Sequence, residues 1–128
     1  MKKPKWLLQE FVIAAQSMVL AEHGGPPGIR DLNMLELALA RPKNKQAYEP
    51  KCSVYDLAAA YSIGIAMDHP FVDGNKRTAL MAGLVFMEIN GCTFAAPEPE
   101  TASIFESSAA GKITEEELSR WCQEQIEV

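Results

Sequence analysis

The segment from Val54 to Met67, VYDLAAAYSIGIAM, places the strongest constraint on the fold of this chain. Apart from Asp56 and Ser62 it is apolar, so a helix formed here would be apolar nearly all round. A helix of that kind is stable only when other elements cover every face. Ser53 and Asp56 have the spacing of a capping box, which predicts where the helix begins. The segment therefore predicts a central helix buried among others.

Two helices are predicted before this segment. The first begins near Pro4 and ends near His23, because apolar residues recur at helical spacing up to the Gly-Gly-Pro-Pro-Gly loop of residues 24–28. The second starts with Asp31 as its N-cap and ends at Pro42, since proline disfavours helix in the residue before it. The polar stretch 43–51 that follows lacks helical periodicity and could hold a short hairpin.

Three helices are predicted after the central one. They cover residues 75–91, about 100–110, and a final segment that opens with the capping box of Thr114 and Glu117. Residues 93–99 are expected to form a linker. A chain of 128 residues is long enough for one well-covered core. The sequence thus predicts an all-α, compact single domain, residues 1–128, of about six helices.

Polar chemistry is concentrated in HPFVDGNKR, from His69 to Arg77, between the central helix and the next one. The first turn of a helix presents unpaired backbone N–H groups and the positive end of the helix dipole. Gly74, Asn75, Lys76 and Arg77 are therefore expected to bind an anion there. Polyphosphate is the natural ligand for two cations added to such a turn.

Asp73 and His69 add two further functions to this stretch. Beside a bound phosphate, a single carboxylate such as Asp73 suits Mg²⁺, which keeps several water ligands. The imidazole of His69 can accept a proton from an attacking hydroxyl. The same residues also fit a solvated turn, with His69 as the partner of a helix C-terminus. Consecutive cations at a helix start are unfavourable without an anion, which favours the functional interpretation.

The composition excludes several other classes of protein. A net charge of −5 argues against direct nucleic-acid binding, and no apolar stretch is long enough for a membrane span. The cysteines are odd in number and form no Cys-x-x-Cys pair, so no disulfide framework is expected. A cytoplasmic location is therefore expected. No His or Cys spacing suggests a zinc site. Outside the motif, Arg30 and Arg41 are expected to form surface salt bridges, with contact to the nucleotide or the antitoxin as the alternative.

HPFVDGNKR resembles the signature loop of the Fic/Doc family, His-x-Phe-x-Asp/Glu-Gly/Ala-Asn-Gly/Lys-Arg, at every defined position. EHGGPPGIRDLNMLELALARP and QAYE resemble the N-terminal half of Doc-type toxins in that family. The resemblance extends from about residue 5 to residue 125. It implies the Fic/Doc-like fold, in which the signature loop lies between two central helices.

The resemblance also implies a role for each residue of the loop. His69 would be the catalytic base that activates a Ser, Thr or Tyr hydroxyl of a target protein, and Phe71 would anchor the loop in the core. Asp73 would hold Mg²⁺. The phosphates of the co-substrate ATP would bind at Gly74, Asn75, Lys76 and Arg77.

A second region is placed by the resemblance alone. Residues 43–51, with Lys43, Lys45 and Tyr48, lie where the family has a flap that docks the target as an added strand. No inhibitory Ser/Thr-x-x-x-Glu-Gly/Asn motif occurs. The resemblance therefore implies inhibition in trans by a cognate antitoxin.

The residue at position 76 of the motif differs between two groups of the family that have different activities. Adenylylating members resemble one another in having Gly at this position, whereas Doc-type toxins have Lys and phosphorylate a Thr of translation elongation factor Tu, which arrests translation. Lys76 thus favours transfer of the γ-phosphate of ATP. Pro70 and Gly74 are the residues that the adenylylating branch prefers, so adenylylation is the alternative. A non-catalytic nucleotide-binding or regulatory module is a further alternative.

Overall fold

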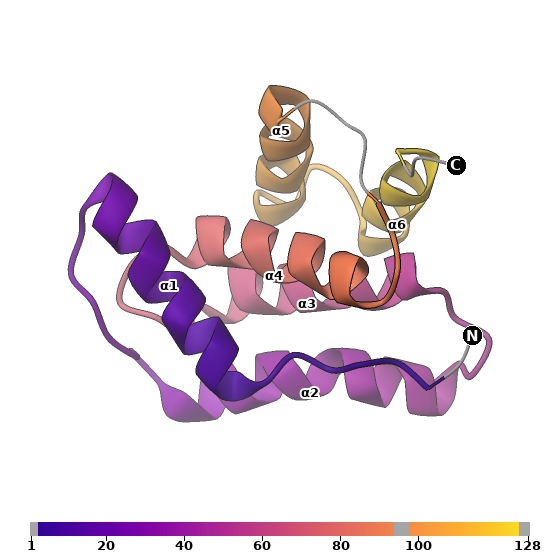
Figure 1. The fold of residues 1–128 in the computed structure, drawn as a ribbon, viewed down its shortest axis with the longest axis horizontal. Coiled ribbons are helices and arrows are strands. Elements are labelled where there is room, and N and C mark those ends of the chain that lie inside the picture. Colours follow the sequence, from indigo (N-terminus) through magenta and orange to yellow (C-terminus); the bar gives the residue numbers. More distant parts are fainter. Residues whose placement is uncertain (1–2, 94–97, 126–128) are drawn as a thin grey trace.

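In residues 3–93 and 98–125, which it describes, the computed structural model contains six α-helices (Figure 1). They are α1 (Gln9–His23), α2 (Leu32–Tyr48), α3 (Val54–Asp68), α4 (Asn75–Ile89), α5 (Glu98–Ala109) and α6 (Glu115–Glu124). Within those ranges the only β-type pairing is an isolated antiparallel bridge between Ile29 and Phe71. The all-α prediction is confirmed.

Helix α3 is the centre of the fold, as its sequence predicts. It packs against α2, α4, α5 and α6, and Figure 1 shows α2 and α4 running along it. Leu57, Tyr61 and Ile65 are fully buried, and three consecutive alanines, residues 58–60, let the neighbouring helices approach closely. Both parts of the capping box of Ser53 and Asp56 are formed. This core fixes the two ends of α3, one of which carries the signature loop.

The first helix begins later than Pro4, so that prediction is wrong. Helix α1 starts at Gln9, and the described residues before it, 3–8, are not helical and contact α3 and the end of α4. Asn90 holds this segment: its Oδ1 accepts from Lys5 N at 2.9 Å and its Nδ2 donates to Lys5 O at 3.0 Å. Leu7 N donates to the Tyr61 hydroxyl at 3.1 Å. Backbone groups of Lys5 and Leu7 are thus paired by tertiary contacts instead of by a helix.

The second helix does not end at Pro42, and the hairpin predicted after it is also wrong. Pro42 lies inside α2, which continues to Tyr48. Proline cannot donate to Ala38 O, but that side of the helix is packed closely on α3, where a Cβ at Gly64 would lie 3.3 Å from the same oxygen. Tertiary packing therefore keeps the chain helical beyond the proline.

Ion pairs on both sides of Pro42 stabilise this last part of α2. Glu115 at the start of α6 accepts from Arg41 Nη2 at 2.7 Å and from Lys45 Nζ at 3.2 Å. Lys45 Nζ also lies 3.4 Å from Glu49. Burial lowers the pKa of the Lys45 amine, but its bonds and charge contacts with Glu115 and Glu49 outweigh burial and raise that pKa. The salt bridge expected for Arg41 is formed.

The C-terminal helices agree closely with the sequence. Helix α5 begins at Glu98, slightly before the predicted Glu100, and α6 opens with the predicted capping box of Thr114 and Glu117. Most of the predicted linker, residues 94–97, lies outside the described residues. None of the helices in the described part of the chain has the length and hydropathy of a membrane span.

Candidate active site

The signature loop is a tight reversal between α3 and α4. His69 is the C-cap of α3 and has the left-handed conformation, φ 48° and ψ 54°. It is the one non-glycine residue with positive φ in the described part of the chain. Phe71 follows with only 1% of its surface exposed, and Gly74, also left-handed, starts α4. The loop thus places His69 at one helix end and the first turn of α4 at the other.

Asn75 holds the loop together from inside. Its Oδ1 accepts from Phe71 N at 3.0 Å, and its Nδ2 donates to Phe71 O at 3.0 Å. The residue is 9% exposed. The side chain predicted to bind phosphate is therefore bonded to the loop backbone, and what Asn75 offers an anion is its backbone N–H.

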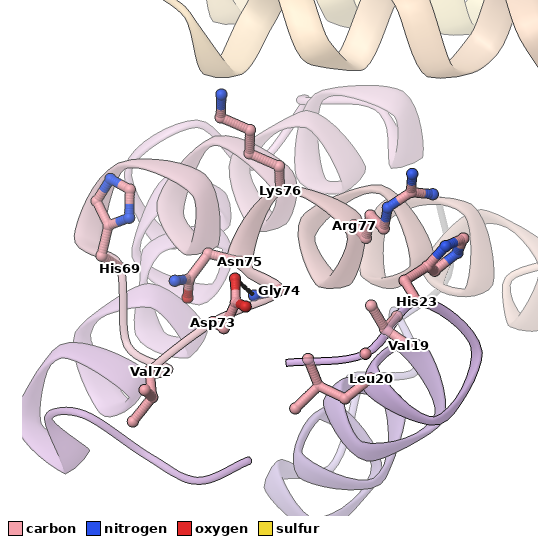
Figure 2. Close-up of a pocket in the computed structure, with 11 residues that line it drawn as sticks. Val19, Leu20, His23, His69, Val72, Asp73, Gly74, Asn75, Lys76 and Arg77 are labelled. Carbon is pink, nitrogen blue, oxygen red and sulfur yellow. Dashed lines mark hydrogen bonds between the residues drawn. The ribbon is translucent and has the colours of Figure 1, made fainter. Parts of the chain in front are cut away.

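A cavity of about 630 Å³ opens beside the loop (Figure 2). Its lining brings together the predicted residues His69, Asp73, Gly74, Asn75, Lys76 and Arg77. Val72 and the C-terminal part of α1 complete the wall, with Val19, Leu20, His23 and Gly24. Phe71 is not part of the lining, because it points into the core.

The start of α4 has the properties of an anion site. Gly74 provides no side-chain cap, and the first helical hydrogen bond runs from Thr78 N to Gly74 O at 2.9 Å. The N–H groups of the first turn therefore have no partner within the helix. Lys76 and Arg77 are exposed, and neither forms an ion pair with an acidic side chain among residues 3–93 and 98–125. Two uncompensated cations lie beside free backbone donors.

Asp73 is fixed at the edge of this turn. Its Oδ1 accepts from Gly74 N at 2.7 Å, and its backbone oxygen accepts from Nε2 of the buried Gln16 at 3.2 Å. No group of three or more His, Cys, Asp or Glu side chains suited to a metal occurs in the described residues. Asp73 is thus a single carboxylate beside an anion site. This donor set fits Mg²⁺, which completes its shell with water and phosphate oxygens.

Two parts of the site were missed by sequence reasoning. His23, at the end of α1, lines the same cavity as His69 and points toward Arg77 in Figure 2. Residues 24–31 run beside the loop: Val72 N donates to Gly28 O at 3.0 Å, and Arg30 N donates to Pro70 O at 2.7 Å. Residue spacing predicts neither contact, because both depend on how the helices fold back.

Gly25 shows how closely this segment approaches the loop. A Cβ at Gly25 would lie 2.5 Å from Oδ2 of Asp73, and φ at this position is +123°. Only glycine combines that conformation with such an approach to a carboxylate. Gly25 thus lies directly against the carboxylate of Asp73 at the edge of the cavity.

The predicted flap residues are not brought to the cavity. Lys43, Lys45 and Tyr48 lie in the C-terminal part of α2, which joins α3 at the end opposite the loop (Figure 1). The 15 residues of α3 separate the two ends by about 22 Å. Lys43 Nζ lies 6.0 Å from the ring centre of Trp6, and Tyr48 is 88% exposed. Because this part of α2 is helical, it does not offer an edge strand.

The comparisons with known proteins identify the family of this chain. A family model described as the Fic/DOC family matches residues 6–87. The chain is 33% identical over 105 residues to "Protein kinase doc" of Escherichia phage P1, with 82% of each chain covered. It is 38% identical over 93 residues to "Toxin Doc" of Mycolicibacterium smegmatis, covering 72% of this chain and 69% of that protein. The chain therefore belongs to the Fic/DOC family.

Proposed function

We propose that this chain is a Doc-type toxin, a protein kinase that transfers the γ-phosphate of ATP to a Ser or Thr hydroxyl of a target protein and so arrests translation. Membership of the Fic/DOC family and the two relatives named Doc support the class of activity. The observation that carries the proposal is the single cavity shared by His69, Asp73 and the cationic first turn of α4. These are the groups that phosphoryl transfer requires.

The residues of the cavity have separate roles in this reaction. The first turn of α4, with Lys76 and Arg77, binds and orients the phosphates of ATP. His69 accepts the proton of the target hydroxyl. The hydroxyl oxygen then forms a bond to the γ-phosphorus, while the bond from that phosphorus to the bridging oxygen breaks and ADP leaves. The proton on His69 is afterwards released to solvent, which restores the base.

Asp73 would hold Mg²⁺ in this proposal. The ion, when bound, would neutralise charge on the phosphates. Asp73 is positioned for a ligand by two other groups, since Gly74 N fixes its Oδ1 and Gln16 fixes its backbone. Its carboxylate needs no second acidic residue, because the other ligands can be water and phosphate.

Lys76 supports phosphorylation over adenylylation. Lys76 lines the cavity beside the first turn of α4, where it adds a positive charge that glycine would lack. Adenylylation is the second candidate, because adenylylating members prefer the residues found at Pro70 and Gly74. The group transferred distinguishes the two directly.

The partners in this proposal are a target, translation elongation factor Tu, and a cognate antitoxin, with the reaction in the cytoplasm. The antitoxin would inhibit in trans through a segment that folds on binding. If Lys43, Lys45 and Tyr48 contact the target, they do so from the end of a helix and not as an added strand.

The test uses ATP labelled at either the γ- or the α-phosphate. The purified protein and its His69→Ala variant are incubated with bacterial lysate and Mg²⁺. Label from the γ-phosphate on one protein band, absent with His69→Ala, is the expected result. Label from the α-phosphate would replace phosphorylation by adenylylation, and no label from either would leave nucleotide binding without catalysis.

A further inference from the structure

We infer that Arg30 is a positioning residue that holds the turn carrying the catalytic base, His69. The inference rests on the proposed function in one respect, the role of His69 as the base. It does not depend on which phosphate of ATP is transferred. Arg30 lies on the segment 24–31 and is absent from the lining of the cavity, so it acts on the turn and not on the nucleotide.

Arg30 is bonded to three consecutive backbone carbonyls. Its Nη2 donates to Asp68 O at 2.9 Å, its Nε donates to His69 O at 2.6 Å, and its backbone N donates to Pro70 O at 2.7 Å. Asp68 is the last residue of α3, and Pro70 is the first residue after His69. One residue thus spans the whole backbone of the turn that carries the base.

The conformation of His69 explains why such a contact is needed. A left-handed backbone, here with φ 48°, is unfavourable for a residue with a Cβ and persists only where the surroundings hold it. The carbonyls at the end of α3 also lack helical partners and carry the negative end of the helix dipole. A guanidinium satisfies both requirements, because it is cationic and donates two N–H bonds in a fixed plane.

Among the described residues, no acidic side chain competes with the turn for the guanidinium of Arg30. The salt bridge expected from the sequence is not formed: no acidic side chain in residues 3–93 and 98–125 pairs with Arg30. Its side-chain hydrogen bonds go to the two carbonyls instead. Lysine could supply the charge but not the two-pronged contact.

The test is a double-mutant cycle on the rate of label transfer from ATP. Arg30→Gln should lower kcat on the order of 10² while leaving KM for Mg²⁺–ATP unchanged, because the base is misplaced and the phosphate site is intact. In the His69→Ala background the same substitution should cause no further loss. Arg30→Lys should fall between the wild type and Arg30→Gln. Arg120→Gln, the same change at an exposed position on α6 outside the cavity, is the control.

Each other outcome separates the two proposals. Equal losses from Arg30→Gln with and without His69 would overturn the positioning role, as would a wild-type rate for Arg30→Lys. Failure of both Arg30 variants to fold, judged by thermal melting, would make Arg30 a general structural residue and also overturn it. A full rate for His69→Ala would instead remove His69 as the base, and the proposed mechanism would fail with it.

Discussion

The side-chain amide of Asn75 pairs with both backbone groups of Phe71, accepting from its N–H and donating to its carbonyl, each at 3.0 Å. Asn90 pairs with Lys5 in the same way, at 2.9 and 3.0 Å. The two asparagines therefore make equivalent bonds at opposite ends of α4. Only Asn75 does so beside the cavity.

Asn75→Ala should lower the free energy of unfolding by about 2 kcal/mol, because it leaves two buried backbone groups of Phe71 unpaired. Urea unfolding measures this loss. The variant should also lose most of its transfer activity, since the loop would no longer be held against α4. Asn90→Ala is the matched control, and it should lose stability while keeping its rate. An Asn75→Ala enzyme with wild-type activity would show that the loop needs no internal bond.

Gly25→Ala should weaken Mg²⁺–ATP binding, because its new methyl group would displace the carboxylate of Asp73. Gly28→Ala provides the comparison. Its φ of +118° nearly equals the +123° of Gly25, but nothing lies within 4 Å of its Cβ position. Both variants should lose similar stability from the strained backbone. Calorimetry with Mg²⁺–ATP should show the larger loss of affinity for Gly25→Ala, and equal affinities would contradict the contact with Asp73.

Lys76→Gly should shift the enzyme from phosphorylation toward adenylylation. Glycine would remove a charge and the volume beside the first turn of α4, which lets the phosphates lie deeper against the helix start. Mass spectrometry of the modified target distinguishes the two products by mass. Lys112→Gly, at an exposed position outside the cavity, controls for loss of a charge. Unchanged phosphorylation in Lys76→Gly would show that another residue sets the position of the phosphates.

Protonation of Asp56 should lower the stability of the fold at acidic pH. Burial raises the pKa of its carboxyl, but hydrogen bonds from Ser119 and Ser53, together with the charge of Lys45, lower the pKa below its usual 3.8. A carboxyl whose pKa is lower in the folded state contributes stability above its unfolded pKa, and that contribution is lost as pH falls through the folded value. Asp56→Asn does not titrate. Urea unfolding from pH 7 downward should therefore show a smaller loss in the variant, and parallel curves would exclude this role.

The helices were predictable where their signals are local. Two capping boxes, at Ser53 and Thr114, place helix starts correctly because each involves residues within one turn. Pro42 misled the prediction because its effect on α2 is offset by packing on Gly64 and by ion pairs to Glu115, which are distant in sequence. A proline signal is local, whereas the contacts that override it are not.

The site shows the same division. The motif from His69 to Arg77 is continuous, so its residues were found together. His23 and Arg30 reach the loop only through the fold, and no spacing in the sequence indicates either. The side chain of Asn75 was expected at the phosphates because of its place in the motif, yet the structure bonds it to Phe71. A motif thus indicates which residues belong to the site, but it does not indicate which atoms each of them contacts.

The central position of α3 has a consequence for motion at the site. Amides of a helix covered by neighbours exchange with solvent only through large openings of the core, whereas exposed segments open easily. The base and the phosphate-binding turn are both attached to ends of the packed pair α3 and α4, while the facing wall ends in the exposed residues 21–30. Hydrogen exchange should thus be slow behind the reacting groups and fast across from them. Nucleotide can then enter and leave by local fluctuation of residues 21–27, while Gly28 and Arg30 stay bonded to the loop that carries the base.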